Sequence, residues 1–557
     1  MKQLEPILFS TLRGYSRKQL LSDVVAGIIV AIIALPLSIA LALASGVGPE
    51  QGLYTAIVAG FVIALLGGSH VQISGPTAAF ATIVAGIVAR NGMDGLVTAT
   101  ILAGIILILL GVCHLGALIK YIPLTITTGF TAGIAVTIVI GQLKDFFGIT
   151  YAAGLSPVET MEKLHAFVAH FATAQSDAVI VGLICLLVLI FFPRITDKIP
   201  PSLVAVVVGI VLVKVFPLNV NTIGDLYTIS NELPKLRLPH FDYQLIRTAL
   251  PDAFTIAILA AIESLLSCVV ADGMIGVKHR SNTELVAQGV GNVASALFGG
   301  IPATGAIART AANVKNGGRT PIAGMVHAVV LLLVLVLLMP LAGWIPMPTI
   351  AAILFMVAYN MCQWRSFVHL LKTESKTDSV VLLLSFFLTV FFDLVVAIEV
   401  GMLMACLLFM KGMSDKTELK GWRYLDELSP EEREADAQRL LSIPDGIQIY
   451  EISGPLFFGD ANVLDRIVAK DTTRCLIIRM RGVPYLDSTA MSSLIQLWER
   501  CNKHGITLIL SHVNQHPRAA MEKAGFVEMV GADNFCSHID TAIAHAQALM
   551  AEAEATV

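Results

Sequence analysis

A run of small residues around one arginine, "GGIPATGAIARTAANVKNGG" at residues 299–318, decides the fold of this chain. It is rich in Ala and Gly, holds a Pro near its start, and carries the permanent charge of Arg309 within an apolar region. A charged side chain inside a membrane is costly and usually faces a cavity or a partner. Small neighbours such as Ala306 and Ala308 let a ligand approach backbone N–H groups closely. The stretch therefore predicts a polar site inside an apolar protein.

The composition of the whole chain shows why that charge is unusual. Of its 557 residues, 56% are hydrophobic and only 14% are charged. A water-soluble protein of this length could not bury so much apolar surface, so we expect a polytopic α-helical membrane protein. The apolar runs fill residues 24–410, whereas the remainder is typical of a water-soluble domain. The sequence has no basic tract of the kind that binds nucleic acid.

Several functional classes find no support in the sequence. It contains no Walker loop, GxSxG, HExxH or CxxC motif, and its thirteen histidines are scattered. The eight cysteines fit small core hydrophobes better than disulfides or a metal site. The N-terminus lacks the short apolar region and cleavage site of a signal peptide. We therefore predict neither an enzyme nor a metalloprotein.

Apolar segments of spanning or near-spanning length form two sets of seven, about fourteen in all. The first set lies at roughly 24–45, 52–67, 75–90, 95–113, 121–141, 177–193 and 200–216. The second lies at roughly 250–272, 284–299, 303–313, 320–340, 347–361, 378–392 and 394–411. A repeat with an odd number of spans enters the membrane in opposite senses, so the pattern predicts a seven-plus-seven inverted repeat.

The third and tenth segments are short and begin beside Gly and Pro, at "QISGPTAAF" (72–80) and "IPATGAIAR" (301–309). In an inverted repeat these two broken helices point their N-termini at each other near the middle of the bilayer. Each N-terminus exposes unpaired N–H groups and about half a positive charge, so together they predict an anion site. The alternative is that Gly and Pro only kink two packing helices.

Basic residues predict the orientation, because Lys and Arg concentrate on the cytoplasmic side. With an even number of spans between them, most basic clusters fall on one side: Arg13, Arg17, Lys18, Arg194, Lys198, Lys278, Arg280, Lys315, Arg319, Arg365, Lys372, Lys411 and Lys416. The loop at 217–247, with Lys235, Arg237 and Arg247, is an exception. We expect an inner-membrane protein of a bacterium with both termini in the cytoplasm.

Several positions carry the expected chemistry besides Arg309. Ser74 and Thr77 accompany Ala78 at the start of the third span, and Glu263 lies deep in the eighth, in "AILAAIESLLSCVVADG" (257–273). Burial disfavours the charged form of a carboxyl group, so Glu263 is suited to binding a proton or a cation. A salt bridge between Glu263 and Arg309 is the alternative, and Arg309 can also extend to the membrane surface. Ser267, one turn from Glu263, fits a ligand or a helix–helix contact.

Several motifs together resemble the sulfate permease (SulP) family, called solute carrier family 26 in animals. They are "GPEQGLYTAIVAGFVIALLGGS" (48–69), "SGPTAAF" (74–80), "AIESLL" (261–266) and "ATGAIARTAANVKNGGRTP" (303–321). The resemblance implies a core domain of spans 1–4 and 8–11 that moves against a gate domain of spans 5–7 and 12–14, in an elevator-like motion. It also implies a homodimer. The substrate-facing positions it implies are Leu37, Leu41, Thr77, Ala78, Ala306, Ala308 and Arg309, with Glu263 close by.

Two features bear on the transported ion. Sodium-coupled bicarbonate carriers of the family look to have Asp where this chain has Glu263, and residues 261–292 are similar to the bacterial proton-coupled dicarboxylate branch. The resemblance therefore implies proton-coupled uptake of C4-dicarboxylates such as succinate or fumarate, with no cofactor beyond the co-transported proton or sodium ion. Alternatives are a sulfate or bicarbonate symporter, an anion exchanger or channel, a nucleobase carrier, and a membrane-anchored signalling protein. Glu50 fits a second protonation site or a solvated helix start.

The C-terminal region has a different character. Residues 412–440 are charged and predict a linker, and 441–557 alternate strands such as "RCLIIRM" (474–480) with helices, which predicts a small cytoplasmic α/β domain. The stretch "VPYLDSTAMSSLIQLWERCNKHG" (483–505) resembles the STAS domain, in which the position of Ser488 is phosphorylated. The alternative is that Asp487 and Ser488 cap the helix. The remaining predicted boundaries are a cytoplasmic segment at 1–23 and a transmembrane domain at 24–411, and a cytoplasmic protein partner of the STAS domain is implied.

Overall fold

The computed structural model describes residues 4–117, 122–152, 155, 157–196, 199–216, 218–237, 242–392, 394–421, 446–459, 461–469 and 472–555. Lys198 and residues 422–440 of the predicted linker lie outside these ranges. The chain divides into two compact units, residues 1–402 and 403–557, which are taken in turn below.

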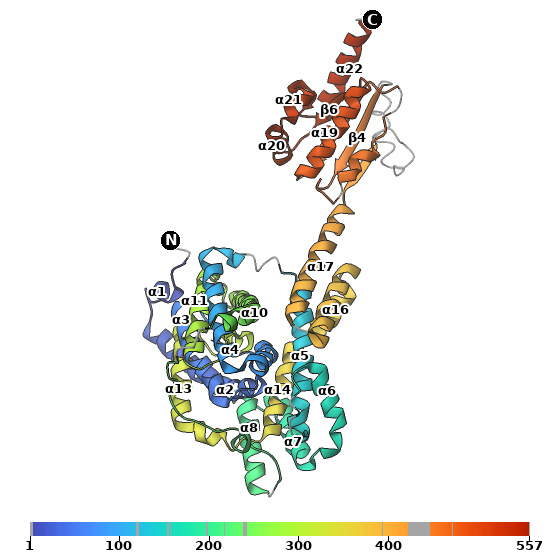
Figure 1. Cartoon of the computed structure of the whole chain (residues 1–557). Coiled ribbons are helices and arrows are strands. Elements are labelled where there is room, and N and C mark those ends of the chain that lie inside the picture. Colours follow the sequence, from blue (N-terminus) through green and yellow to red (C-terminus); the bar gives the residue numbers. More distant parts are fainter. Residues whose placement is uncertain are drawn as a thin grey trace. The chain divides into compact units, whose positions relative to one another are not determined.

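The first unit is almost entirely helical (Figure 1). Its first half holds α1 (Ile7–Thr11), α2 (Arg17–Ala44), α3 (Pro49–Leu66), α4 (Ala78–Val112), α5 (Leu124–Phe147), α6 (Thr160–Ala169), α7 (Ser176–Phe191) and α8 (Pro201–Val215). Its second half holds α9 (Ile223–Leu226), α10 (Tyr243–Ile275), α11 (Ser281–Leu297), α12 (Ile307–Lys315), α13 (Ile322–Ala342), α14 (Met347–Cys362), α15 (Trp364–Thr373), α16 (Lys376–Phe391) and the start of α17 (Leu394–Ser414).

The described residues contain nine helices that are long and apolar enough to cross a membrane. Every predicted apolar segment overlaps a helix, but several, including the nine-residue α12, are too short to count among those nine. The predicted third and fourth segments join in α4, whose regular helix is interrupted at Gly92 with φ 66°. Glycine adopts this left-handed region without steric cost. Fourteen spans therefore remains a prediction, while a polytopic helical membrane fold is confirmed.

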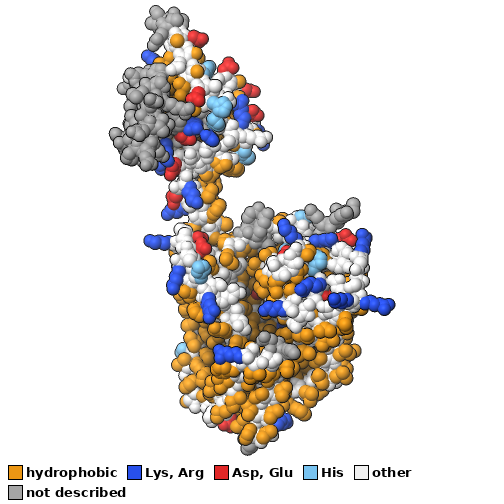
Figure 2. All heavy atoms as spheres, turned by 180° about the vertical axis from the view of Figure 1, so that it is seen from behind, with side chains coloured by type: hydrophobic (Ala, Val, Ile, Leu, Met, Phe, Trp, Pro, Cys, Tyr) orange, Lys and Arg blue, Asp and Glu red, His pale blue; other side chains and the backbone are white. Residues whose placement is uncertain are grey.

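The helices of this unit pack in two groups that also contact each other. One group is formed by α2, α3, α4, α10, α11, α12 and α13, and the other by α5, α7, α8, α14 and α16. These are the core and gate sets that the family resemblance implies. Figure 2 shows a broad hydrophobic surface on this unit with most Lys and Arg side chains of that face gathered at one end. Such a band is what contact with lipid tails requires.

A two-stranded antiparallel pair joins the two halves of the core group. β1 (Ser74–Gly75) lies beside β2 (Thr304–Gly305), with Ser74 opposite Gly305 and Gly75 opposite Thr304. From the sequence, these two helices were predicted to begin at about residues 75 and 303. In the structure, α4 begins at Ala78 and α12 at Ile307. The difference has a physical cause in α4, because a proline at position 76 disfavours helical geometry in the residue before it.

A buried polar stripe on α11 holds this strand pair in place. Glu284, Gln288, Asn292 and Ser295 recur at helical spacing and are at most 1% exposed. Glu284 accepts hydrogen bonds from Gly68 N and from the side chains of the glutamines at 72 and 288, at 2.7–2.9 Å. Asn292 pairs with the backbone N–H and C=O of residue 303, and Ser295 donates to the C=O of residue 301. The stripe thus satisfies backbone groups that a membrane interior cannot.

The second unit has a five-stranded sheet in the order β3-β4-β5-β6-β7. Its strands are β3 (Glu418–Gly421), β4 (Ile447–Ser453), β5 (Cys475–Gly482), β6 (Thr507–Ser511) and β7 (Phe535–Cys536), and β3 alone is antiparallel to its neighbour. Its helices are α19 (Ser488–Lys503), α20 (Gln515–Lys523), α21 (Phe526–Val530) and α22 (Ile539–Ala555). Alternate residues of β5 are buried on both faces of the sheet, as a parallel sheet covered by helices requires. Residues 418–421 were expected in the linker but form β3, because they pair along their length with β4.

Candidate functional site

The strand pair brings the N-termini of α4 and α12 together. The N–H of Ala306 donates to Ile73 O at 2.9 Å, and the hydroxyls of Ser264 and Thr304 hydrogen-bond at 2.7 Å. Ser74, predicted to bind substrate, is 2% exposed and its hydroxyl accepts a hydrogen bond from Gln288 at 3.2 Å. In these contacts the hydroxyl groups position the strands, so Ser74 has a structural role in this arrangement.

Glu263 of α10 lies at the start of α4. The Thr77 hydroxyl, at the N-cap of α4, donates a 3.0 Å hydrogen bond to Glu263 Oε2. Ala78 and Ala306, the residues beside the two helix starts, are 6% and 9% exposed and carry only methyl groups. A carboxyl group, a hydroxyl and two helix N-termini therefore meet in one place, as the sequence predicted for Glu263, Thr77 and Ala78.

Ser267 lies on α10 one turn after Glu263. Its hydroxyl donates to Thr310 Oγ1 at 3.3 Å, and Thr310 Oγ1 also accepts from Ile73 N at 3.0 Å. Ser267 is fully buried. Of the two roles expected for Ser267, the structure shows the contact between helices, which links α10 to α12.

Arg309 is 2% exposed and does not extend to the membrane surface. A Cβ atom placed on Gly75 would lie 2.7 Å from Arg309 Nη1 and 3.5 Å from Ala56 Cα. The guanidinium group therefore lies against β1 and α3. Both Nη atoms lack a hydrogen-bond partner within the described ranges, and none of the ion pairs there includes Arg309. The alternative that Arg309 forms a salt bridge with Glu263 is thus absent from this part of the chain. Ala308, the residue before Arg309, is exposed.

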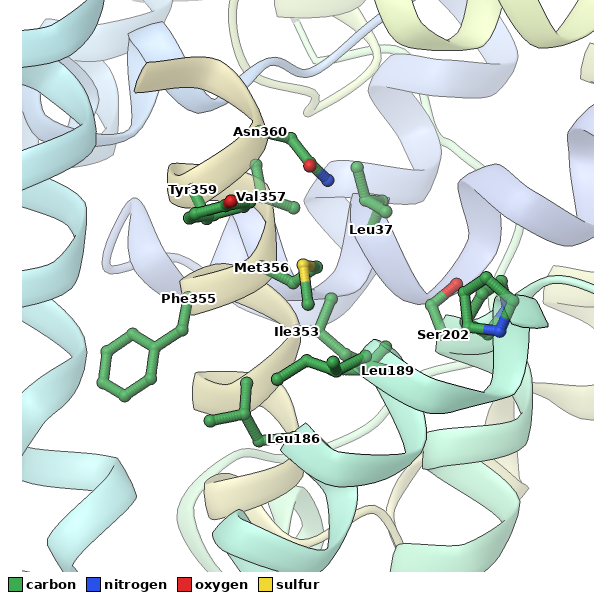
Figure 3. A pocket seen from close by; sticks show the side chains of 13 residues that line it. Leu37, Leu186, Leu189, Ser202, Ile353, Phe355, Met356, Val357, Tyr359 and Asn360 are labelled. Carbon is green, nitrogen blue, oxygen red and sulfur yellow. The ribbon is translucent and has the colours of Figure 1, made fainter. Parts of the chain in front are cut away.

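The two leucines of α2 differ in their surroundings. Leu37 lines a cavity of about 780 Å³ between α2 and helices α7, α8 and α14 (Figure 3). Leu41 is only 2% exposed and is part of the core. The cavity wall is largely apolar, with polar groups from Ser202, Tyr359 and Asn360. The cavity thus lies between one core helix and three gate helices.

Glu50 lies apart from this site. It belongs to the first turn of α3 and lines a smaller pocket of about 110 Å³ together with Tyr54, Glu232, Lys235 and Arg237, among others. Glu50 Oε2 has no hydrogen-bond partner among the described residues. The structure does not bring Glu50 and Glu263 together in one pocket.

Sequence reasoning missed two buried polar residues of the core group. Asp23 is fully buried in α2 and accepts hydrogen bonds from the Tyr15 hydroxyl at 2.8 Å, Arg319 N at 2.7 Å and Thr320 Oγ1 at 2.6 Å. Burial and this bond to Asp23 raise the pKa of Tyr15 to about 12. His327 of α13 is also fully buried. The signal for His327 was a polar residue inside a predicted span, whereas Asp23 was expected in the cytoplasmic segment just before the first span.

In the second unit, Asp487 is the N-cap of α19. Its carboxylate accepts hydrogen bonds from Ala490 N at 2.9 Å and Phe458 N at 2.8 Å. Ser488 is the first residue of the helix and is exposed. The capping alternative is therefore right for Asp487, and phosphorylation of Ser488 stays a prediction.

Comparisons with known proteins cover almost the whole chain. The model of the sulfate permease family matches residues 20–385, and that of the STAS domain matches residues 439–542. YvdB of Bacillus subtilis (strain 168), named as a sulfate transporter, is 38% identical over 95% of this chain and 98% of its own length. The bicarbonate transporter BicA of Picosynechococcus sp. (strain ATCC 27264 / PCC 7002 / PR-6) is 32% identical over 89% of this chain and 87% of its own.

Among solved structures, murine Slc26a9, an anion transporter in the inward-facing state, has the same fold. It superposes with a TM-score of 0.86 over 98% of this chain and 94% of its own, at 19% identity.

Proposed function

This chain belongs to the sulfate permease family of anion transporters and carries a STAS domain, and from this premise we propose that it takes up a small anion together with protons by secondary active transport. The observation that carries the proposal is the contact between Thr77 and Glu263 at the start of α4, beside the start of α12. It puts a protonatable group at the place where two helix N-termini attract an anion.

The anion site rests on three features that act together. The first turns of α4, from Ala78, and of α12, from Ile307, offer backbone N–H groups with small side chains such as Ala78 and Ala308 around them. The charge of Arg309 lies behind β1 with no carboxylate paired to it in the described part of the chain. In a medium of low dielectric such a charge acts over a longer range than in water, so Arg309 attracts an anion without direct contact.

The coupling to protons follows from charge competition. An ionised Glu263 occupies the positive end of α4 and repels an incoming anion, whereas a protonated Glu263 leaves that end free. Anion and proton therefore load together. Glu50, in its separate pocket, is a second candidate for protonation that acts at a distance from this site.

For the substrate we propose C4-dicarboxylates, on the similarity of residues 261–292 to the dicarboxylate branch. Sulfate and bicarbonate are the second candidates, because relatives of 38% and 32% identity are named as transporters of these ions. The cavity beside Leu37 supports an elevator-like motion, since it lies between α2 of the core and the gate helices α7, α8 and α14. We further propose a homodimer in the bacterial inner membrane with both termini in the cytoplasm and a STAS domain that binds a cytoplasmic protein.

Uptake by the full chain in proteoliposomes tests the proposal. Succinate, fumarate, sulfate, bicarbonate and chloride compete in turn for uptake, with and without sodium, under an imposed pH gradient. We expect Glu263→Gln to lose the response to the pH gradient and Glu374→Gln, an exposed carboxylate outside the site, to keep it. Full pH-driven uptake by Glu263→Gln contradicts the coupling role. Conductance in planar bilayers far above carrier turnover would instead indicate a channel.

A further inference from the structure

His327 is a polar residue of the core group that the anion site described above does not use. It lies in α13 with an exposed fraction of 0%, and neither Nδ1 nor Nε2 has a hydrogen-bond partner in the part of the chain that the structure describes. Buried polar atoms are almost always paired, and leaving them unpaired costs free energy. The residue therefore calls for a function beyond packing.

The packing of α13 on α3 places His327 at the level of β1. A Cβ atom placed on Gly324 would lie 3.0 Å from Ala64 Cβ, so the start of α13 meets the end of α3. One turn forward along α13 comes His327, and one turn back along α3 comes Gly60. A Cβ atom on Gly60 would lie 3.1 Å from the carbonyl oxygen of Ser74. This spacing puts His327 on the face of α13 that packs on α3, near the level of β1.

Arg309 reaches the same layer from α12. Its Nη1 lies beside Gly75, next to Ala56, which is one further turn along α3 from Gly60. A guanidinium group with two unpartnered Nη atoms and an imidazole with two unpartnered nitrogens, all within the described ranges, therefore share one buried layer. The missing side chain of Gly75 leaves the room that the guanidinium group occupies.

We propose that His327 is the positioning residue of Arg309: the guanidinium group donates a hydrogen bond to a water molecule, which donates one to a ring nitrogen of His327, and this bridge holds the charge behind the two helix N-termini. A neutral imidazole offers one acceptor nitrogen and one donor. A neutral imidazole can hold a guanidinium group without cancelling its charge, whereas a carboxylate would cancel that charge. The full field of Arg309 then remains directed at the anion. This inference rests on the proposed function, in which that field binds the anion.

A double-mutant cycle on the full chain in proteoliposomes tests the proposal, with KM for the transported anion as the readout. His327→Leu removes both ring nitrogens at similar size, and we expect KM to rise by about tenfold, the loss typical of one hydrogen bond to a charged group. In an Arg309→Ala background the same substitution should change KM by less than about twofold, because its effect passes through Arg309. His327→Gln keeps an acceptor and should retain most of the affinity.

Three outcomes overturn the inference. They are an equal effect of His327→Leu in both backgrounds, an unchanged KM in His327→Leu alone, and an equal loss in His327→Gln and His327→Leu. Ser385→Ala is the matched control, because it removes an equally buried and, within the described residues, unpartnered hydroxyl from the gate group. Thermal unfolding in detergent verifies that each variant is folded, and if His327→Leu is not, His327→Phe replaces it in the cycle. An unchanged KM in Arg309→Ala contradicts the proposed function itself, which separates the two failures.

Discussion

The Thr77 hydroxyl at the first turn of α4 donates a 3.0 Å hydrogen bond to Glu263 of α10. The two residues are far apart in the sequence and belong to opposite halves of the core group. Because of this contact, a change in the charge of Glu263 changes the electrostatic potential at the start of α4. The following predictions depend on this contact and on the packing around the strand pair.

Thr77→Val removes the hydrogen-bond donor while keeping the shape of the side chain. Because Glu263 then loses its contact with α4, we expect pH-gradient-driven uptake to fall by up to about tenfold, the loss of one hydrogen bond to a charged group. Thr77→Ser retains the donor and should retain most of the response. Uptake by both variants in proteoliposomes at matched protein density gives the comparison, and equal behaviour of the two would rule out the hydroxyl as the coupling element.

Gly75→Ala places a methyl group 2.7 Å from Arg309 Nη1. Since the backbone of α3 lies on the other side, the guanidinium group must move, and overpacking of this kind costs about 1–3 kcal/mol. We expect a raised KM and a lower unfolding temperature. Gly141→Ala in α5, where a Cβ atom would meet nothing within 4 Å, is the matched control and should leave both unchanged or raise stability slightly. A normal KM in Gly75→Ala would show that the place of the guanidinium group is unimportant.

Glu284→Ala leaves Gly68 N and the side chains of two glutamines without their acceptor. Breaking a buried network that involves a carboxyl group costs about 3 kcal/mol or more. We expect a large fall in the unfolding temperature measured in detergent, with little change for Glu374→Ala at the surface. A normal unfolding temperature would mean that β1 and β2 stay in place without the α11 stripe.

Tyr15 provides a test of the Asp23 contact in solution. Its raised pKa of about 12 means that the protonated hydroxyl keeps donating to Asp23 well above the usual tyrosine value of 10. The stabilisation is therefore complete below pH 10 and is lost as the pH rises through about 12. The phenolate absorbance of the wild type minus that of Tyr15→Phe should titrate with a midpoint near pH 12. Asp23→Asn should move this midpoint to a lower pH. Titration near pH 10 in the wild type would contradict the contact.

Asp487→Ala removes the acceptor of two backbone hydrogen bonds at the start of α19. Loss of an N-cap costs about 1 kcal/mol, so hydrogen exchange in the first turn of α19 should become several-fold faster. Ser488→Ala should leave this exchange unchanged, because the capping group is the carboxylate. A similar increase in both variants would assign the cap to the two residues jointly.

The broken helices could be predicted from the sequence because Pro76, Gly75 and the small residues around Arg309 act locally. The inverted repeat was predicted by counting spans and stays a prediction, as the number of spans does. The hydrogen-bond partners of the buried polar side chains could not be predicted from the sequence. The spacing of Glu284, Gln288 and Asn292 was visible, but which backbone groups they would hold depends on two segments that reach α11 from opposite ends of the core. The partner of Arg309 was open for the same reason, since a guanidinium group can point along either side of its helix.

The strand pair has a consequence for synthesis of the protein. Ser74 finds its opposite residue only at Gly305, in the other half of the chain. At roughly 5–20 residues per second, the ribosome delivers β2 on the order of ten seconds or more after β1. Until then the backbone groups of β1 lack their final hydrogen-bond partners, in an environment where unpaired groups are expensive. The first half of the transporter must therefore wait in the insertion machinery, or beside water, for the second half to complete it.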